Sequence, residues 1–247
     1  MELQFFYFLI FPLVILQTIV GVGVLVIGTP LLLILNYSII EIMNLLLPIS
    51  ITTSLLNYLY LKYNKKKLQI NLDKSIKKNF IIIFLPGMTI GLILIREFYD
   101  YINFETIVSL VIFLSLFIKW RFEKIIYLLP LLFKKIILIL ISIVHGLTNS
   151  GGTLLTIFFV AFNRDKKNQS RYSITFYYLT LVIVQYLIFL LVFKKKLSLD
   201  YPYQIILLII TATFVGNIIV KRINEKFFKR TIEILALFSA LFLLINN

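Results

Sequence analysis

Long apolar segments separated by short charged ones make up most of this 247-residue chain. A helix that crosses a membrane needs about 20 mainly apolar residues. Segments of about that length occur six times, at 39–61, 79–96, 104–120, 172–193, 203–220 and 228–245. The pattern therefore predicts an all-α polytopic membrane protein.

Two further apolar stretches, 3–35 and 136–162, are interrupted near the middle. The first contains Gly21-Val22-Gly23 and then Gly28-Thr29-Pro30, and the second contains the run from His145 to Thr153. The first is too long for one simple span and too short for two, which need about 40 residues. Gly, Asn, Ser and Thr are weak helix formers. We therefore expect a helix break in each stretch.

Each interrupted stretch has two alternative geometries, a single kinked crossing or a hairpin of half-helices that returns to the same side. Lys and Arg prefer cytoplasmic loops. With hairpins and six full spans, 21 of the 25 basic residues lie inside, in segments 62–78, 119–135, 164–171 and 221–230. With kinked crossings and eight spans, the division is 15 inside and 10 outside. The charge pattern favours hairpins.

A hairpin followed by three spans in each half predicts two inverted repeats, at 1–121 and 122–247. Three is an odd number of crossings, so the second half starts on the opposite side of the membrane. The loop charges agree, because Lys65 to Lys67 belong to a strongly basic loop, whereas the equivalent Lys194 to Lys196 stand alone. Inverted repeats built around discontinuous helices recur in transporters.

Composition narrows the class of protein. Hydrophobic residues make up 60% of the chain and charged residues 15%, whereas soluble domains are about half apolar and a quarter charged. The chain has no cysteine and one histidine, His145, which argues against disulfides and metal or haem centres. We expect no cofactor. The net charge of +14 indicates a cytoplasmic membrane face rather than nucleic acid, and we expect a multi-pass protein of the inner membrane.

The two breaks are the candidate binding site. A half-helix that begins at a break has unpaired N–H groups and a partial positive charge, and glycine lets a ligand come close. We expect a small anion to bind at Gly21, Gly23, Thr29, Asn149, Ser150, Gly151 and Gly152. In the alternative, these glycines only allow close helix packing.

Other polar residues are weaker candidates. His145 precedes the second break, and we consider it as a proton relay; the alternative is a hydrogen-bonded structural residue. Ser, Thr and Asn residues at 50–57, and Ser, Thr and Tyr residues at 173–178, fall within spans and either line a pathway or bond to their own and neighbouring helices. No catalytic motif occurs, so the sequence predicts no catalytic residues and no enzyme activity.

The first break resembles the glycine-rich signature of the TauE/SafE (sulfite exporter) family, Gly-x-Gly-Gly-Gly-x-x-x-x-Pro. Gly21, Gly23 and Pro30 match it, and Val24 and Leu25 replace two glycines. In the second half, Gly151 and Gly152 keep the last two glycines, while Ile157 stands where the proline would be. The resemblance implies transport of small organic or sulfur-containing anions such as sulfite, sulfonates or sulfoacetate.

These observations predict a secondary carrier of small anions that works by alternating access, with the two halves rocking around a site at the breaks. The expected partners are a small anionic substrate and the lipid bilayer, with no nucleic acid, and a homo-oligomer is left open. Two other hypotheses remain, a membrane-embedded enzyme acting on lipids and a non-transporting scaffold subunit.

Overall fold

The computed structural model describes residues 3–64, 80–101, 103–128, 130–162, 167–194 and 203–224, together with scattered positions from 226 to 241. The described chain is helical, and no strand occurs within it, which confirms the all-α prediction. Its elements are α1 (Leu3–Val20), α2 (Val24–Ile34), α3 (Ile39–Tyr63), α6 (Phe80–Phe98), the short 3₁₀ helix η1 (Tyr99–Tyr101), α7 (Phe104–Leu128), α8 (Leu131–Thr148), α9 (Gly152–Phe162), α10 (Lys167–Val192) and α11 (Tyr203–Arg222).

Four helical segments among the described residues are long and apolar enough to cross a membrane: Ile39–Tyr63, Ile82–Tyr101, Lys167–Val192 and Tyr203–Arg222. They coincide with four of the six spans that the sequence predicts. The predicted span 104–120 lies within α7. The predicted span 228–245 lies mostly outside the described residues.

The first interrupted stretch forms a hairpin. Helix α1 ends at Val20, Gly21 takes a left-handed φ of 98°, and α2 begins at Val24. Position 23 packs against the backbone of Gln17, and position 28, further along α2, packs against Leu13. Later residues of α2 thus contact earlier residues of α1, so the two helices are antiparallel. At 1.5 Å per residue, the 11 residues of α2 span about 16 Å, half the thickness of a bilayer core.

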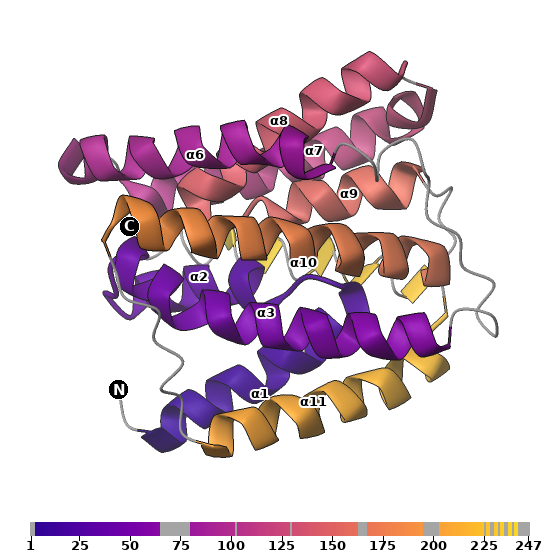
Figure 1. Cartoon of the computed structure of the whole chain (residues 1–247). Helices are drawn as coiled ribbons and strands as arrows, with labels where there is room; N and C mark the ends of the chain where they lie inside the picture. Colours follow the sequence, from indigo (N-terminus) through magenta and orange to yellow (C-terminus); the bar gives the residue numbers. More distant parts are fainter. Residues whose placement is uncertain are drawn as a thin grey trace.

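Helix α3 reverses the chain again and runs parallel to α1. It starts at a capping box, in which the Glu41 N–H donates to Ser38 Oγ and the Ser38 N–H donates to Glu41 Oε2. Position 28 of α2 lies between Leu13 of α1 and Leu46 of α3. Gln17, which is further along α1, bonds to Ser50, which is further along α3. In Figure 1 the starts of α1 and α3 accordingly lie on the same side of the molecule.

The second interrupted stretch also breaks where the sequence predicts. Helix α8 ends at Thr148, Asn149 takes a left-handed φ of 59°, and α9 begins at Gly152. Helix α9 then runs antiparallel to α10, because Asn149 bonds to Gln185 while Phe159 stacks on Tyr177 further along. Like α2, α9 has 11 residues. Both breaks therefore lead into a helix of about half a membrane thickness.

The ends of α3 and α11 and the start of α10 meet at one end of the molecule, on the right in Figure 1. The Lys167 ammonium at the start of α10 donates to the carbonyl oxygens of Val220 and Ile223 at the end of α11, at 3.2 and 2.5 Å. The starts of α3 and α11 lie at the other end. The inverted symmetry of residues 1–121 and 122–247 remains a prediction.

Candidate functional site

The two breaks meet inside the protein. A Cβ placed on Gly152 would lie 3.0 Å from Val26 Cγ2, in α2, and 3.1 Å from the Tyr178 ring, in α10. The Asn149 amide donates to Thr29 Oγ1 at 2.9 Å and so joins the second break to α2. Three of the residues chosen from sequence, from opposite halves of the chain, are thus brought together.

At the first break the helix N-terminus is already capped from within. The backbone N–H of Val24, the first residue of α2, donates to Gln17 Oε1 at 3.0 Å. Gly21 donates its N–H to Gln17 O at 2.7 Å and lies so close to α10 that a Cβ would be 2.7 Å from Ile174 Cγ2. Gly23 is the N-cap residue of α2 and would clash with Gln17 if it carried a Cβ. Close packing is therefore a reason for glycine at both positions, and a binding role for them remains a prediction.

The Gln17 amide is fully used in a buried network with α3 and α10. Its Nε2 donates to Ser50 O at 2.8 Å and to Ser54 Oγ at 2.9 Å. The Ser50 hydroxyl lies 3.2 Å from Gln17 Oε1 and 3.3 Å from the Tyr178 hydroxyl. Each of these side chains is buried. The network holds the first break against α3 and α10.

The second break, in contrast, has buried polar atoms without partners. The Ser150 hydroxyl and Gln185 Oε1 are buried and make no hydrogen bond with the described residues. The Gln185 amide nitrogen is used, donating to Asn149 Oδ1 at 3.1 Å and to His145 O at 3.3 Å. An unsatisfied buried polar group costs about 1–3 kcal/mol. The second break therefore keeps hydrogen-bonding capacity that the first has used.

His145 and Gly151 pack directly on each other at this break. A Cβ on Gly151 would lie 2.6 Å from His145 Cβ, so only glycine fits there. The His145 ring meets the Tyr178 ring edge-on, with centroids 5.9 Å apart, and neither ring nitrogen has a hydrogen-bond partner among the described residues. His145 thus lacks the side-chain hydrogen bonds of the structural alternative. Its role as a proton relay remains a prediction.

One buried residue, Arg171, was missed from sequence, where it is counted as a basic residue of the loop 164–171. It lies in α10 and is 2% exposed. Its Nε donates to Thr18 O at 2.9 Å, and its Nη2 donates to the side-chain oxygens of Asn57 and Asn217, both at 2.7 Å. Arg171 therefore ties α10 to α1, α3 and α11.

The signal that would have found it is helical periodicity of polar residues. Arg171, Thr175, Tyr178 and Gln185 occur at i, i+4, i+7 and i+14 on α10, and Ser50, Ser54 and Asn57 occur at i, i+4 and i+7 on α3. Residues at this spacing share one helix face. The two faces are in contact, since Asn57 bonds to Arg171 and Thr175 and Ser50 bonds to Tyr178.

Arg171 faces a cavity of about 300 Å³ at the end of the molecule where α3, α10 and α11 meet. Basic and polar side chains make up most of the lining, which consists of Tyr60, Asn64, Lys167, Asn168, Arg171, Val220 and Lys221. We call it the basic cavity. A second hollow of about 240 Å³, the apolar groove, adjoins it between α3 and α11 and shares Tyr60 and Lys221.

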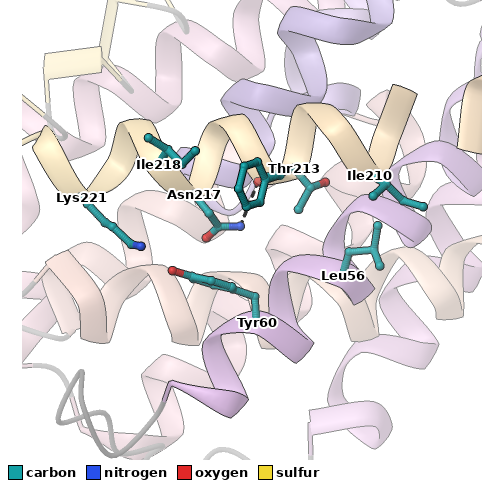
Figure 2. Close-up of a pocket in the computed structure, with 8 residues that line it drawn as sticks. Leu56, Tyr60, Ile210, Thr213, Asn217, Ile218 and Lys221 are labelled. Carbon is teal, nitrogen blue, oxygen red and sulfur yellow. Dashed lines mark hydrogen bonds between the residues drawn. The ribbon is translucent and has the colours of Figure 1, made fainter. Parts of the chain in front are cut away.

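Figure 2 shows the residues of the apolar groove. Lys221, Asn217 and Tyr60 direct their polar ends toward one another near one end, and Leu56 and Ile210 lie near the other. Thr213, Phe214 and Ile218 complete the lining. The side chain of Phe214 is 67% exposed, so the groove opens on the outer surface of the helix bundle. The groove is therefore an apolar surface feature that leads to a basic end.

Comparisons with known proteins identify a family. The family model for the sulfite exporter TauE/SafE matches residues 6–243. No curated protein and no solved structure matches the chain. Among the described residues no three His, Cys, Asp or Glu side chains are grouped as a metal site would require.

Proposed function

Because the chain belongs to the sulfite exporter TauE/SafE family, we propose that this multi-pass membrane protein is a transporter, not an enzyme, and that it carries a small sulfur-containing anion such as sulfite or a sulfonate across the inner membrane. The family gives the class of activity. The choice of anion and the mechanism are proposed from the geometry of the two breaks.

The observation that carries the proposal is the set of unpartnered polar atoms at the second break. The Ser150 hydroxyl is unpartnered among the described residues and lies beside the N-terminus of α9, where the first N–H groups of a helix have no acceptor within the helix itself. The Thr153 N–H donates to Ser150 O at 3.2 Å, so the amides proposed for the anion are the others of this first turn. A hydroxyl and helix N-terminal amides are the donors that an oxyanion needs. A bound anion would accept hydrogen bonds from these unpartnered donors, whose burial otherwise costs stability. Because the donors carry no formal positive charge, the anion would not be held too tightly for release.

The contacts between the two breaks support alternating access as the mechanism. We propose that Asn149, which bonds to Thr29, and Gly152, which packs on Val26, form a joint between the halves that rearranges as the site opens to either side. At Gly21, Gly23 and Gly151 a Cβ would clash with neighbouring atoms, so glycine lets the chain pack closely at the two breaks. Their role is to position the N-terminal amides, and the direct donors to the anion are Ser150 and the first turn of α9.

The test is anion flux by the purified protein reconstituted alone into liposomes. Labelled sulfite, thiosulfate and sulfoacetate are supplied, and uptake and efflux are measured. Flux without a partner chain supports a carrier and contradicts a scaffold subunit. The double variant Gly151→Leu, Gly152→Leu is expected to abolish flux, because a side chain at either position collides with His145 or with α2 and Tyr178. Unchanged flux in a double variant that inserts normally would remove the site.

A further inference from the structure

We propose that the basic cavity is a second oxyanion-binding site, with the Arg171 guanidinium as its main ligand-binding group. It lies at the end of the molecule where α3, α10 and α11 meet. Arg171 precedes Tyr178 by seven residues of α10, which corresponds to about 10 Å along the helix. The site is therefore distinct from the second break, where the transported anion is proposed to bind, although the Thr18 carbonyl that Arg171 contacts lies three residues before Gly21 of the first break. That it passes its anion on to the breaks rests on the proposed function; that it binds an anion does not.

The first argument is that Arg171 is buried and has no counter-ion among the residues that the structure describes. Its three acceptors, the Thr18 carbonyl and the Asn57 and Asn217 side chains, are all neutral. Within the described residues the ion pair that forms is Arg96 with Glu97, far from Arg171 in the sequence. A buried charge is normally paired, because hydrogen bonds to neutral groups leave most of its charge uncompensated. An anion in the cavity supplies the missing charge.

The second argument is geometric. A guanidinium carries five N–H donors in a fixed plane, and the three bonds of Arg171 use Nε and Nη2 but not Nη1. Because Arg171 lines the cavity, Nη1 is the group available to a ligand there. The bonds to α1, α3 and α11 hold the guanidinium in place before a ligand arrives. A planar, preorganised donor of this kind suits the oxygens of sulfate, sulfite or a sulfonate.

The surroundings of Arg171 match the same ligand. Lys221 lines the cavity and is exposed, so it contributes positive charge at the rim, and Asn64 and Asn168 add amide donors. A cavity of about 300 Å³ has room for a small tetrahedral oxyanion with bound water. The recessed position of Arg171 favours a small solute over the headgroup of an anionic lipid. A lipid would place its phosphate at Lys221 and an acyl chain in the apolar groove, along Phe214.

The experiment measures sulfate binding to the detergent-purified full chain, by titration calorimetry and by the shift of the unfolding temperature. We expect Arg171→Gln to weaken sulfate binding at least tenfold and Arg171→Lys to retain part of it. The matched control is Arg96→Gln, an exposed arginine paired with Glu97, which should leave binding unchanged. A folded Arg171→Gln variant with the affinity of the natural chain would overturn the proposal.

A second variant keeps the test decisive if Arg171→Gln does not fold. Lys221 is exposed and makes no side-chain hydrogen bond with the described residues, so Lys221→Gln should fold and should weaken sulfate binding about threefold through loss of charge. Unchanged binding in this variant, with Arg171→Gln unfolded, would contradict the site.

Two further measurements are needed. The first distinguishes a bound solute from a lipid headgroup, and the second distinguishes anion binding at the basic cavity from transport through the breaks. In nanodiscs, sulfate binding should be the same with phosphatidylcholine as with added phosphatidylglycerol. If the anionic lipid abolishes it and Phe214→Ala restores it, the cavity holds a lipid headgroup and the proposal is wrong. The Gly151→Leu, Gly152→Leu variant should lose flux but keep sulfate binding, so failure of the transport proposal and failure of this one give different results.

Discussion

Ser150 is a residue whose side chain costs stability in this structure. Its hydroxyl is buried and has no partner among the described residues. Removing such a group relieves a desolvation penalty of about 1–3 kcal/mol. We therefore predict that Ser150→Ala leaves the unfolding temperature unchanged or raises it, while anion flux in liposomes falls at least tenfold because the proposed donor is lost.

The control for this prediction is Ser142→Ala on the same segment of chain. The Ser142 hydroxyl donates to Ile139 O at 2.7 Å and lies in α8, away from the break. This variant should keep its flux. If Ser150→Ala instead lowers the unfolding temperature and keeps full flux, Ser150 is a structural residue and does not contact the anion.

At the scale of elements, Asn149 decides how α8 ends. It takes a left-handed φ of 59° and bonds to Thr29 and Gln185 through its side chain. Asn149→Gly removes the bonds but accepts the backbone conformation, whereas Asn149→Ala also incurs left-handed strain of about 1–2 kcal/mol. We predict that both variants are less stable than the natural chain and that the alanine variant is the less stable of the two.

Chemical unfolding in detergent measures this difference, and flux measures its consequence. Because both variants break the joint between the two breaks, both should transport more slowly. Equal stability of the glycine and alanine variants would mean that the chain at 149 relaxes out of the left-handed conformation. In that case the left-handed conformation of residue 149 is not required for the turn between α8 and α9.

The elements that local composition specifies were predictable from sequence. Both breaks fall at runs of weak helix formers, which interrupt a helix most readily. The run Gly28-Thr29-Pro30, in contrast, lies inside α2 and does not interrupt it. The ranges of α3 and α11 and the end of α10 follow from apolar length. The turn at Gly21 also follows, since a left-handed φ favours glycine.

The missed residues depend on contacts between distant parts of the chain. Arg171 was assigned to a loop because apolar length placed the span at 172–193, whereas α10 begins at Lys167. Its partners Thr18, Asn57 and Asn217 lie on three other helices, so no local pattern contains them. Likewise, Gln17 caps a helix that begins seven residues later. Burial of a charge is a property of the packed bundle.

For the whole molecule, charge distinguishes the two ends of the helix bundle. The end that contains the basic cavity has Lys62, Lys167 and Lys221. At the end of α6 the one basic residue, Arg96, is paired with Glu97. Basic segments stay in the cytoplasm. We therefore expect the basic cavity to open to the cytoplasm, where it would gather the anions that we propose as substrates.

This orientation is testable with single cysteines, since the natural chain has none. Four exposed positions serve as reporters, Tyr63, Asn224, Tyr101 and Tyr203. A membrane-impermeant maleimide applied to spheroplasts should label Tyr101→Cys and Tyr203→Cys, and inside-out vesicles should label Tyr63→Cys and Asn224→Cys. Eight kinked crossings instead predict that positions 63 and 224 lie on opposite faces. Labelling of Asn224→Cys together with Tyr101→Cys would therefore exclude the re-entrant hairpins and, with them, a cytoplasmic basic cavity.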